Sequence, residues 1–209
     1  MDQIVTISAS YGTGGSVVAP AVAEALGFPF LDRAVTGRDP VVNSFSQEAA
    51  SEEERTGGLW ARVLETLAQA PTDAVPSGSI GMVGNDDALR TNAEAQLRAF
   101  VAGGEGVILG WASAIVIPSA YHVRLHGPLE ARLRQGMAIG GKLSEAAARS
   151  QLEQTDRVRS LYWRRLYRRD IGDSSHYHLV VDSTAIDLGV VRELIITGAR
   201  AYWEAKSAS

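Results

Sequence analysis

The sequence predicts an α/β protein in which a parallel β-sheet is flanked by helices on both faces. Short apolar runs alternate with longer stretches of helical periodicity, and the first run leads through a glycine-rich turn into a helix. This alternation is typical of parallel strands joined by helical crossovers. Such sheets bind ligands outside the carboxyl ends of their strands, which is where the glycine-rich turn is expected.

The first unit is expected to be a strand, a loop, a helix and a second strand. Pro20 is tolerated only in or near a first helical turn, so the helix starts at about Ser16, and Gly27 stops it. The expected elements are a strand over 4–7, a loop over 8–16, a helix over 16–26, and a strand over 28–31 that ends at Asp32 and Arg33.

The rest of the chain continues the alternation after an interruption. Residues 34–89 carry acidic runs, glycine pairs and a Pro-Ser-Gly tract, with one amphipathic stretch over 59–67, and are expected to form an insertion. The elements expected after it are a helix over 91–101, strands over 107–110 and 120–125, a helix capped by Ser144, an arginine-rich helix over 152–169, a strand over 179–182 and a helix starting at Asp187.

Composition limits the function classes. The chain has 209 residues, 45% of them hydrophobic, which is enough for one domain with a core. It has no cysteine, which excludes a thiolate nucleophile, a cysteine zinc site and a disulfide. No run of eighteen apolar residues occurs and the first residues do not form a signal peptide, so we expect a cytoplasmic protein without a membrane partner.

The charge is unevenly distributed. Between Arg124 and Arg169, ten arginines and Lys142 face four acidic residues, a net charge of +7, whereas the whole chain carries -4. Arginine suits forked recognition of phosphate or carboxylate, so this segment indicates an anionic ligand held in one place. The alternative is a solvated helix face. The overall acidity argues against nucleic acid as a partner.

The glycine loop is the strongest candidate binding element. Its residues are Gly12, Thr13, Gly14, Gly15 and Ser16. Such a loop directs backbone N–H groups inward at a helix N-terminus and can surround a phosphate, although a tight turn without ligand is the alternative. The chain matches neither the dinucleotide pattern, whose third glycine is Val17 here, nor the G-x-x-x-x-G-K-[ST] phosphate loop, whose lysine is Gly15.

Collinear motifs resemble the cytidylate kinase-like branch of the P-loop nucleoside monophosphate kinases. The resemblance spans nearly the whole chain except residues 34–89, and it includes the double glycine of the loop. The segments that carry it are 5–16, 26–33, 106–110, 122–125, 130–132, 155–159, 162–164 and 177–184.

This resemblance implies a P-loop NTPase-type fold and an ATP-dependent phosphotransferase that uses Mg²⁺ and acts on a nucleoside monophosphate or a similar small acceptor. It implies one domain with a core over 1–33, 90–136 and 170–209, a nucleotide-monophosphate-binding insertion over 34–89 and a helical lid over 137–169. The residues to which it assigns roles are the glycine loop for ATP, Ser16 as a weak Mg²⁺ ligand, Asp32 and Arg33 for the acceptor, and Arg132, Asp156, Arg157, Arg159 and Arg164 for catalysis.

The chain also departs from that branch. Neutral residues stand at three places where the branch carries charge: Ala9-Ser10, Ser16 and Trp111. A catalytically inactive relative that binds a nucleotide or another anion to regulate a partner is therefore the alternative hypothesis. Trp111 is a base-stacking candidate or, more simply, a core residue. Trp163 is expected to pack the lid helix onto the core, and His176 and His178 to be surface histidines.

Overall fold

The computed structural model describes residues 2–33, 86–110, 112–140 and 143–208; within these ranges the side chains of residues 33, 86, 88, 89 and 92 are not described. The elements are β1 (Gln3–Ala9), α1 (Gly15–Leu26), β2 (Phe30–Arg33), α4 (Asp86–Val101), β3 (Glu105–Gly110), α5 (Ser113–Val116), β4 (Tyr121–His126), α6 (Leu129–Gly140), α7 (Glu145–Tyr167), the 3₁₀ turn η1 (Ser174–His176), β5 (Leu179–Asp182) and α8 (Leu188–Ser207).

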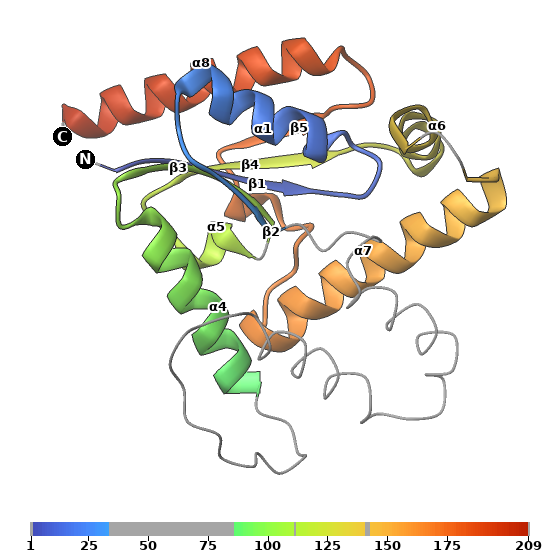
Figure 1. The fold of residues 1–209 in the computed structure, drawn as a ribbon, viewed down its shortest axis with the longest axis horizontal. Coiled ribbons are helices and arrows are strands. Elements are labelled where there is room, and N and C mark those ends of the chain that lie inside the picture. Colours follow the sequence, from blue (N-terminus) through green and yellow to red (C-terminus); the bar gives the residue numbers. More distant parts are fainter. Residues whose placement is uncertain (1, 34–85, 111, 141–142, 209) are drawn as a thin grey trace.

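The strands form one parallel sheet in the order β2-β3-β1-β4-β5. In the centre, Val5 of β1 is in register with Val107 of β3 and with Tyr121 of β4. Helices α1 and α8 cover one face, and α4, α5 and α7 lie on the other (Figure 1). This arrangement confirms the predicted fold class. It also places the carboxyl ends of β1, β2 and β3 at one edge of the sheet.

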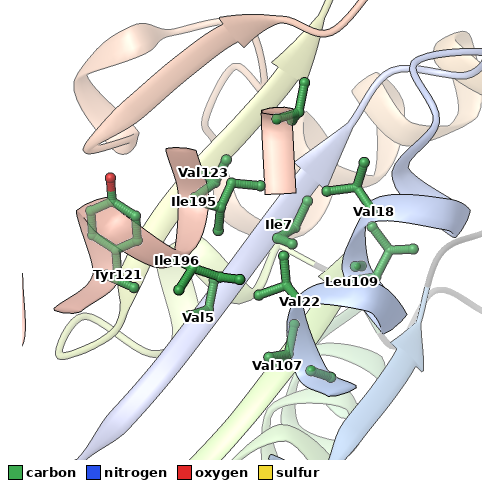
Figure 2. Close-up of a cluster of buried hydrophobic side chains, with 14 of the residues drawn as sticks. Val5, Ile7, Val18, Val22, Val107, Leu109, Tyr121, Val123, Ile195 and Ile196 are labelled. Carbon is green, nitrogen blue, oxygen red and sulfur yellow. The ribbon is translucent and has the colours of Figure 1, made fainter. Parts of the chain in front are cut away.

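Alternate residues of β1 supply the two cores. Val5 and Ile7 pack with residues of α1 and α8, including Val22 and Ile195, in the cluster shown in Figure 2. Ile4 joins the cluster on the opposite face. All of these side chains are fully buried. Because β1 is buried on both faces, the loop that leaves its carboxyl end starts from a rigid base.

The first unit differs from prediction in two details. Pro20 lies in the second turn of α1, because the helix begins at Gly15. The second strand is shifted to Phe30–Arg33, since Phe28 still takes part in the C-terminal capping of α1: its N–H donates to the carbonyl of Ala23 at 2.9 Å. Gly27, with a φ of 73°, closes that helix as predicted.

Later helices differ more. α4 begins at Asp86, five residues before the expected start. The helix capped by Ser144 and the arginine-rich helix are one continuous helix, α7, and the Ser144 side chain accepts from the N–H of Ala147 as expected of a cap. α5 and α6 were not predicted as helices. The amphipathic stretch 59–67 lies outside the described residues. In the part of the chain that is described, no helix has the length and apolar character to cross a membrane.

Candidate functional site

The loop between β1 and α1 has a shape that only glycine permits at two positions. Gly12 has a φ of 80°, and a Cβ there would overlap the backbone carbonyl of Arg132. Gly14, with a φ of 74°, is the N-cap of α1, and a Cβ there would come within 2.7 Å of the Leu188 side chain. A side chain at either position would therefore require both a strained backbone and displacement of a neighbouring segment.

Buried hydroxyl groups fix the middle of the loop. The Thr13 Oγ1 donates to the carbonyl of Ser10 at 2.7 Å, and the carbonyl of Thr13 accepts from the Oγ of Ser183 at 2.8 Å. Thr13 and Ser183 are both fully buried. The segment after β5 thus supports the loop from below. Ser183 was not predicted as a site residue, although it belongs to the last segment that carries the family resemblance.

An ion pair between α6 and α7 holds the loop at Tyr11. Asp156 accepts from the Tyr11 N–H at 2.8 Å through Oδ1 and pairs with Arg132 at 2.5 Å through Oδ2. Arg132 in turn donates to the carbonyl of Tyr11 at 3.0 Å and to that of Gly127 at 2.9 Å. Both polar groups of the Tyr11 backbone are therefore bonded to one salt bridge. These two residues lie behind the loop as its support.

Two further arginines approach the start of the loop. Nη1 of Arg159, on α7, donates to the carbonyl of Ala9 at 2.6 Å. Nη2 of Arg124, on β4, donates to Oγ of Ser10 at 2.8 Å. Burial lowers the pKa of Arg159 to about 10, with Asp156 opposing the shift, and burial also lowers the pKa of Arg124. Arg159 stays protonated at neutral pH, since its pKa lies well above 7.

A cavity of about 580 Å³ opens in front of the loop. Its lining runs from the glycine loop to Asp32 of β2, Gly110 of β3, the end of α6 and one side of α7. Among the described residues, the charged ones that line it are Asp32 and Arg159. Asp32 is exposed, is in register with Leu109 of β3, and is one of the groups that act electrostatically on Arg159. The cavity therefore joins a backbone cradle, one cation and one carboxylate.

The structure places some of the predicted site residues at the cavity and others away from it. It brings Gly12, Gly14, Gly15 and Ser16, together with Asp32 and Arg159, to the cavity lining, while Thr13 lies buried beneath the loop. Arg157 is exposed on α7 and is not part of that lining. Arg164 is also exposed and pairs with Asp170 at 3.3 Å. The Arg33 side chain and Trp111 lie outside the described residues. The proposed roles of all these residues remain predictions.

Sequence reasoning missed Arg124 as a residue that contacts the loop, although a signal was present. An arginine between Val123 and Leu125 interrupts the apolar run of a buried strand. A charged residue is buried only where polar groups receive it, so its position indicated a nearby polar site. Trp163, by contrast, is 2% exposed and packs against Ala112, Ala114 and Ile171, which confirms the predicted packing of its helix onto the core.

Comparison with known proteins agrees with this geometry. Residues 4–185 match the family model of the cytidylate kinase-like family. A curated relative, uronate isomerase of Corynebacterium glutamicum, is 28% identical over 179 residues; the match covers 83% of this chain but 33% of that protein, so the chain spans about a third of its length.

Solved structures resemble the chain over nearly its whole length. An uncharacterised protein from Eubacterium ventriosum has a TM-score of 0.64 at 16% identity, covering 96% of this chain and 99% of its own. A gluconokinase from Sinorhizobium meliloti has a TM-score of 0.51 at 16% identity, covering 98% and 96%. A deoxyadenosine kinase from M. mycoides has a TM-score of 0.51 at 12% identity, covering 95% and 99%. At these identities the likeness establishes a P-loop kinase fold.

Proposed function

The chain belongs to the cytidylate kinase-like family, and from that premise we propose that it transfers a phosphoryl group from ATP to a small acceptor bound near Asp32. The observation that supports this most is the cavity in which the glycine loop, Asp32 and Arg159 meet. Phosphoryl transfer needs donor and acceptor aligned and negative charge neutralised, with little covalent work by the protein. This cavity offers those elements at the carboxyl edge of a parallel sheet.

The residues of the loop fit a triphosphate. The first N–H groups of a helix have no intrahelical partner, and the positive end of the helix dipole favours an anion. Gly14 and Gly15 line the cavity at that end of α1, and their lack of side chains lets phosphate oxygens approach the backbone. The Arg132–Asp156 pair holds the loop from behind through the backbone of Tyr11.

The cavity lining also offers one residue that fits a magnesium ion. Ser16 is exposed, lines the cavity and belongs to the first turn of α1, so it is the residue whose hydroxyl would hold Mg²⁺. Hydroxyl and water oxygens are ligands that Mg²⁺ accepts beside phosphate oxygens. When bound, the ion neutralises charge on the transferred group.

The acceptor that the family suggests is a nucleoside monophosphate. The exposed carboxylate of Asp32 favours a hydroxyl compound as a second candidate, because a hydroxyl loses a proton when it attacks phosphorus and a carboxylate in reach can accept that proton. In that case the hydroxyl oxygen bonds to the γ-phosphorus, the bridging bond to ADP breaks, and the proton passes to Asp32.

The test measures ADP release from ATP–Mg²⁺ by purified protein with a panel of nucleoside monophosphates, polyols and sugar acids, and measures thermal unfolding with ATP alone. We expect ATP to raise the unfolding temperature and one acceptor class to stimulate ADP release. Asp32→Asn should lower a hydroxyl-dependent rate at least about hundredfold, whereas it should change a monophosphate-dependent rate far less.

Asp2→Asn serves as the matched control, because Asp2 is exposed and precedes the opposite end of β1. Protection by ATP without turnover on any acceptor would reject the kinase and support the inactive, nucleotide-binding alternative. If no nucleotide protects the protein from unfolding, both hypotheses are wrong.

A further inference from the structure

The phosphate loop of this chain lacks the lysine that the G-x-x-x-x-G-K-[ST] pattern requires. The spacing aligns Ala9 with the first glycine, Gly14 with the second, Gly15 with the lysine and Ser16 with the hydroxyl residue. Two positions of the pattern are therefore altered together: a residue with a side chain replaces the first glycine, and glycine replaces the lysine.

The two altered positions touch each other. A Cβ built on Gly15 would lie 2.7 Å from the Cβ of Ala9 and 3.4 Å from a methyl group of Leu109. Carbon atoms pack at about 3.5–4.0 Å, so the Ala9 methyl group excludes every side chain at position 15 unless the backbone shifts. Ala9 and Gly15 are thus one packing exchange, and a lysine cannot be restored at position 15 alone.

Arg159 reaches the same place from another element. Its Nη1 donates to the carbonyl of Ala9 at 2.6 Å, and its side chain lines the cavity together with Ala9 and Gly15. A guanidinium has five N–H donors in a planar fork, a geometry that matches phosphate oxygens. This bond therefore holds the Arg159 guanidinium on Ala9, the residue whose methyl group excludes a side chain at position 15.

Helix α7 is fixed to the loop at a second point, three residues earlier. Asp156 accepts from the N–H of Tyr11, so one face of α7 contacts the loop on both sides of Ser10. Residues three apart on a helix share a face, which explains why Asp156 and Arg159 reach the loop together. The guanidinium is therefore held by a fixed helix with an ordered loop beneath it.

We propose that Arg159 supplies to the donor phosphates the positive charge that a lysine at position 15 supplies in the common phosphate loop, and that the Ala9–Gly15 exchange makes this substitution necessary. This inference rests on the proposed function, because it presumes that ATP binds at the loop. It gives Arg159 a role that differs from that of an arginine on a mobile lid: the cation is in place before the nucleotide arrives.

The test uses ATP with Mg²⁺ as the probe and measures its affinity by thermal unfolding and by calorimetry. Arg159→Gln should weaken ATP binding roughly ten- to hundredfold, the range of a charge-assisted hydrogen bond. Arg200→Gln removes an exposed arginine of α8 and should leave the affinity unchanged within about twofold.

A rescue experiment distinguishes loss of the positive charge at the phosphates from a general loss of structure in Arg159→Gln. Adding Ala9→Gly and Gly15→Lys to Arg159→Gln should restore ATP affinity to within about threefold of the original protein, because the ammonium then reaches the same phosphates. Gly15→Lys without Ala9→Gly should not restore it. A folded triple variant that still binds ATP weakly would overturn the proposal.

The remaining outcomes are also decisive. If Arg159→Gln binds ATP as tightly as the original protein, the inference is wrong while the proposed function stands; if the original protein does not bind ATP at all, the proposed function itself is wrong. Should Arg159→Gln fail to fold, Ala9→Gly with Gly15→Lys in the presence of Arg159 carries the test. A second cation at the same phosphates should raise ATP affinity about tenfold, and unchanged affinity would contradict the proposal.

Discussion

Arg132 and Asp156 form an ion pair at 2.5 Å, and each of them also bonds to the backbone of Tyr11. The side chains are 11% and 27% exposed. A pair that is this shielded, and that also satisfies backbone groups, contributes more than a surface salt bridge does. It joins α6, α7 and the phosphate loop into one unit.

Removing either partner of this pair should therefore affect both stability and ligand binding. Asp156→Asn or Arg132→Met is expected to lower the free energy of unfolding by about 2–4 kcal/mol, since the other charge is left without its partner. In a double-mutant cycle the coupling energy should be about 1–3 kcal/mol. Urea unfolding measures both quantities, and additive effects of the two substitutions would contradict the clamp.

Gly15→Ala should destabilise the protein although alanine is the better helix former. The added methyl group would meet Ala9 at 2.7 Å, and overpacking of this kind costs about 1–3 kcal/mol. The companion substitution Ala9→Gly removes the opposing methyl group and should recover most of the loss. Thermal unfolding of the single and double variants tests this, and a Gly15→Ala protein as stable as the original would show that the loop relaxes freely.

Ser183→Ala should loosen the loop from below. The hydroxyl donates to the carbonyl of Thr13 in a fully buried position, so its removal leaves a buried acceptor unsatisfied at a cost of about 1–3 kcal/mol. The loss should appear in urea unfolding and also as weaker protection by ATP. The neighbouring Thr184→Ala, which loses a bond to the carboxylate of Asp182, is the comparison, and it should change stability without changing ATP protection.

Acidification should destabilise the protein through His122. This residue is 5% exposed, and burial lowers its pKa to about 4, with further lowering by His178, Lys206 and His176. The unfolded chain binds a proton below about pH 6.5 that the folded protein does not take up until about pH 4. The buried neutral imidazole therefore contributes fully to the free energy of unfolding above about pH 6.5. About 3 kcal/mol of that free energy is lost as the pH falls to about 4.

His122→Gln should remove this part of the pH dependence. Measuring the free energy of unfolding at pH 7 and pH 4 in both proteins isolates the histidine from the carboxylates, which titrate in both. Between pH 7 and pH 4 the original protein should lose about 3 kcal/mol more free energy of unfolding than the variant, and parallel curves would contradict this. Thr6 contacts Nδ1 of His122 at 2.7 Å, so the amide keeps a polar partner.

Much of the fold followed from the sequence because its signals are local. Runs such as Val107 to Leu109 and Leu179 to Asp182 predicted strands, and Asp187 predicted the start of α8, where its side chain accepts from Gly189 at 2.7 Å. The order of the strands was not predicted, because pairing of residues more than a hundred positions apart leaves no local pattern. The four-residue helix α5 was too short to show a period.

The site was harder to predict, since its arginines look alike in sequence. Arg157, Arg159 and Arg164 share one helix, and only the direction of each side chain decides which reaches the cavity. Asp156 and Arg159 lie three residues apart on the face toward the loop, whereas Arg157 is turned about 100° from Asp156. The helical period predicts which of these residues share a face of α7. It does not predict which face contacts the loop, because that depends on how α7 packs.

The contacts of His178 also depend on packing that the local sequence does not show. The alternation of His176 and His178 predicted surface histidines; His178 is exposed as predicted, whereas the His176 side chain is 11% exposed. What the sequence did not predict is that His178 stacks on Tyr121 and on His122, with ring centroids 5.5 and 5.0 Å apart, and that its Nδ1 accepts from the N–H of His122 at 2.9 Å. These partners come from β4, more than fifty residues earlier in the chain. Their contact depends on strand pairing, which the local sequence does not encode.

The phosphate loop is encoded near the start of the chain but is shaped by its second half. Residues 9–15 are held by Arg132, Asp156, Arg159 and Ser183. During synthesis these partners leave the ribosome more than a hundred residues after the loop itself, so the loop cannot take its binding form until they have emerged. Contacts of such long sequence separation also slow folding. A nascent chain that ends before Asp156 should therefore bind no nucleotide, however complete its glycine motif is.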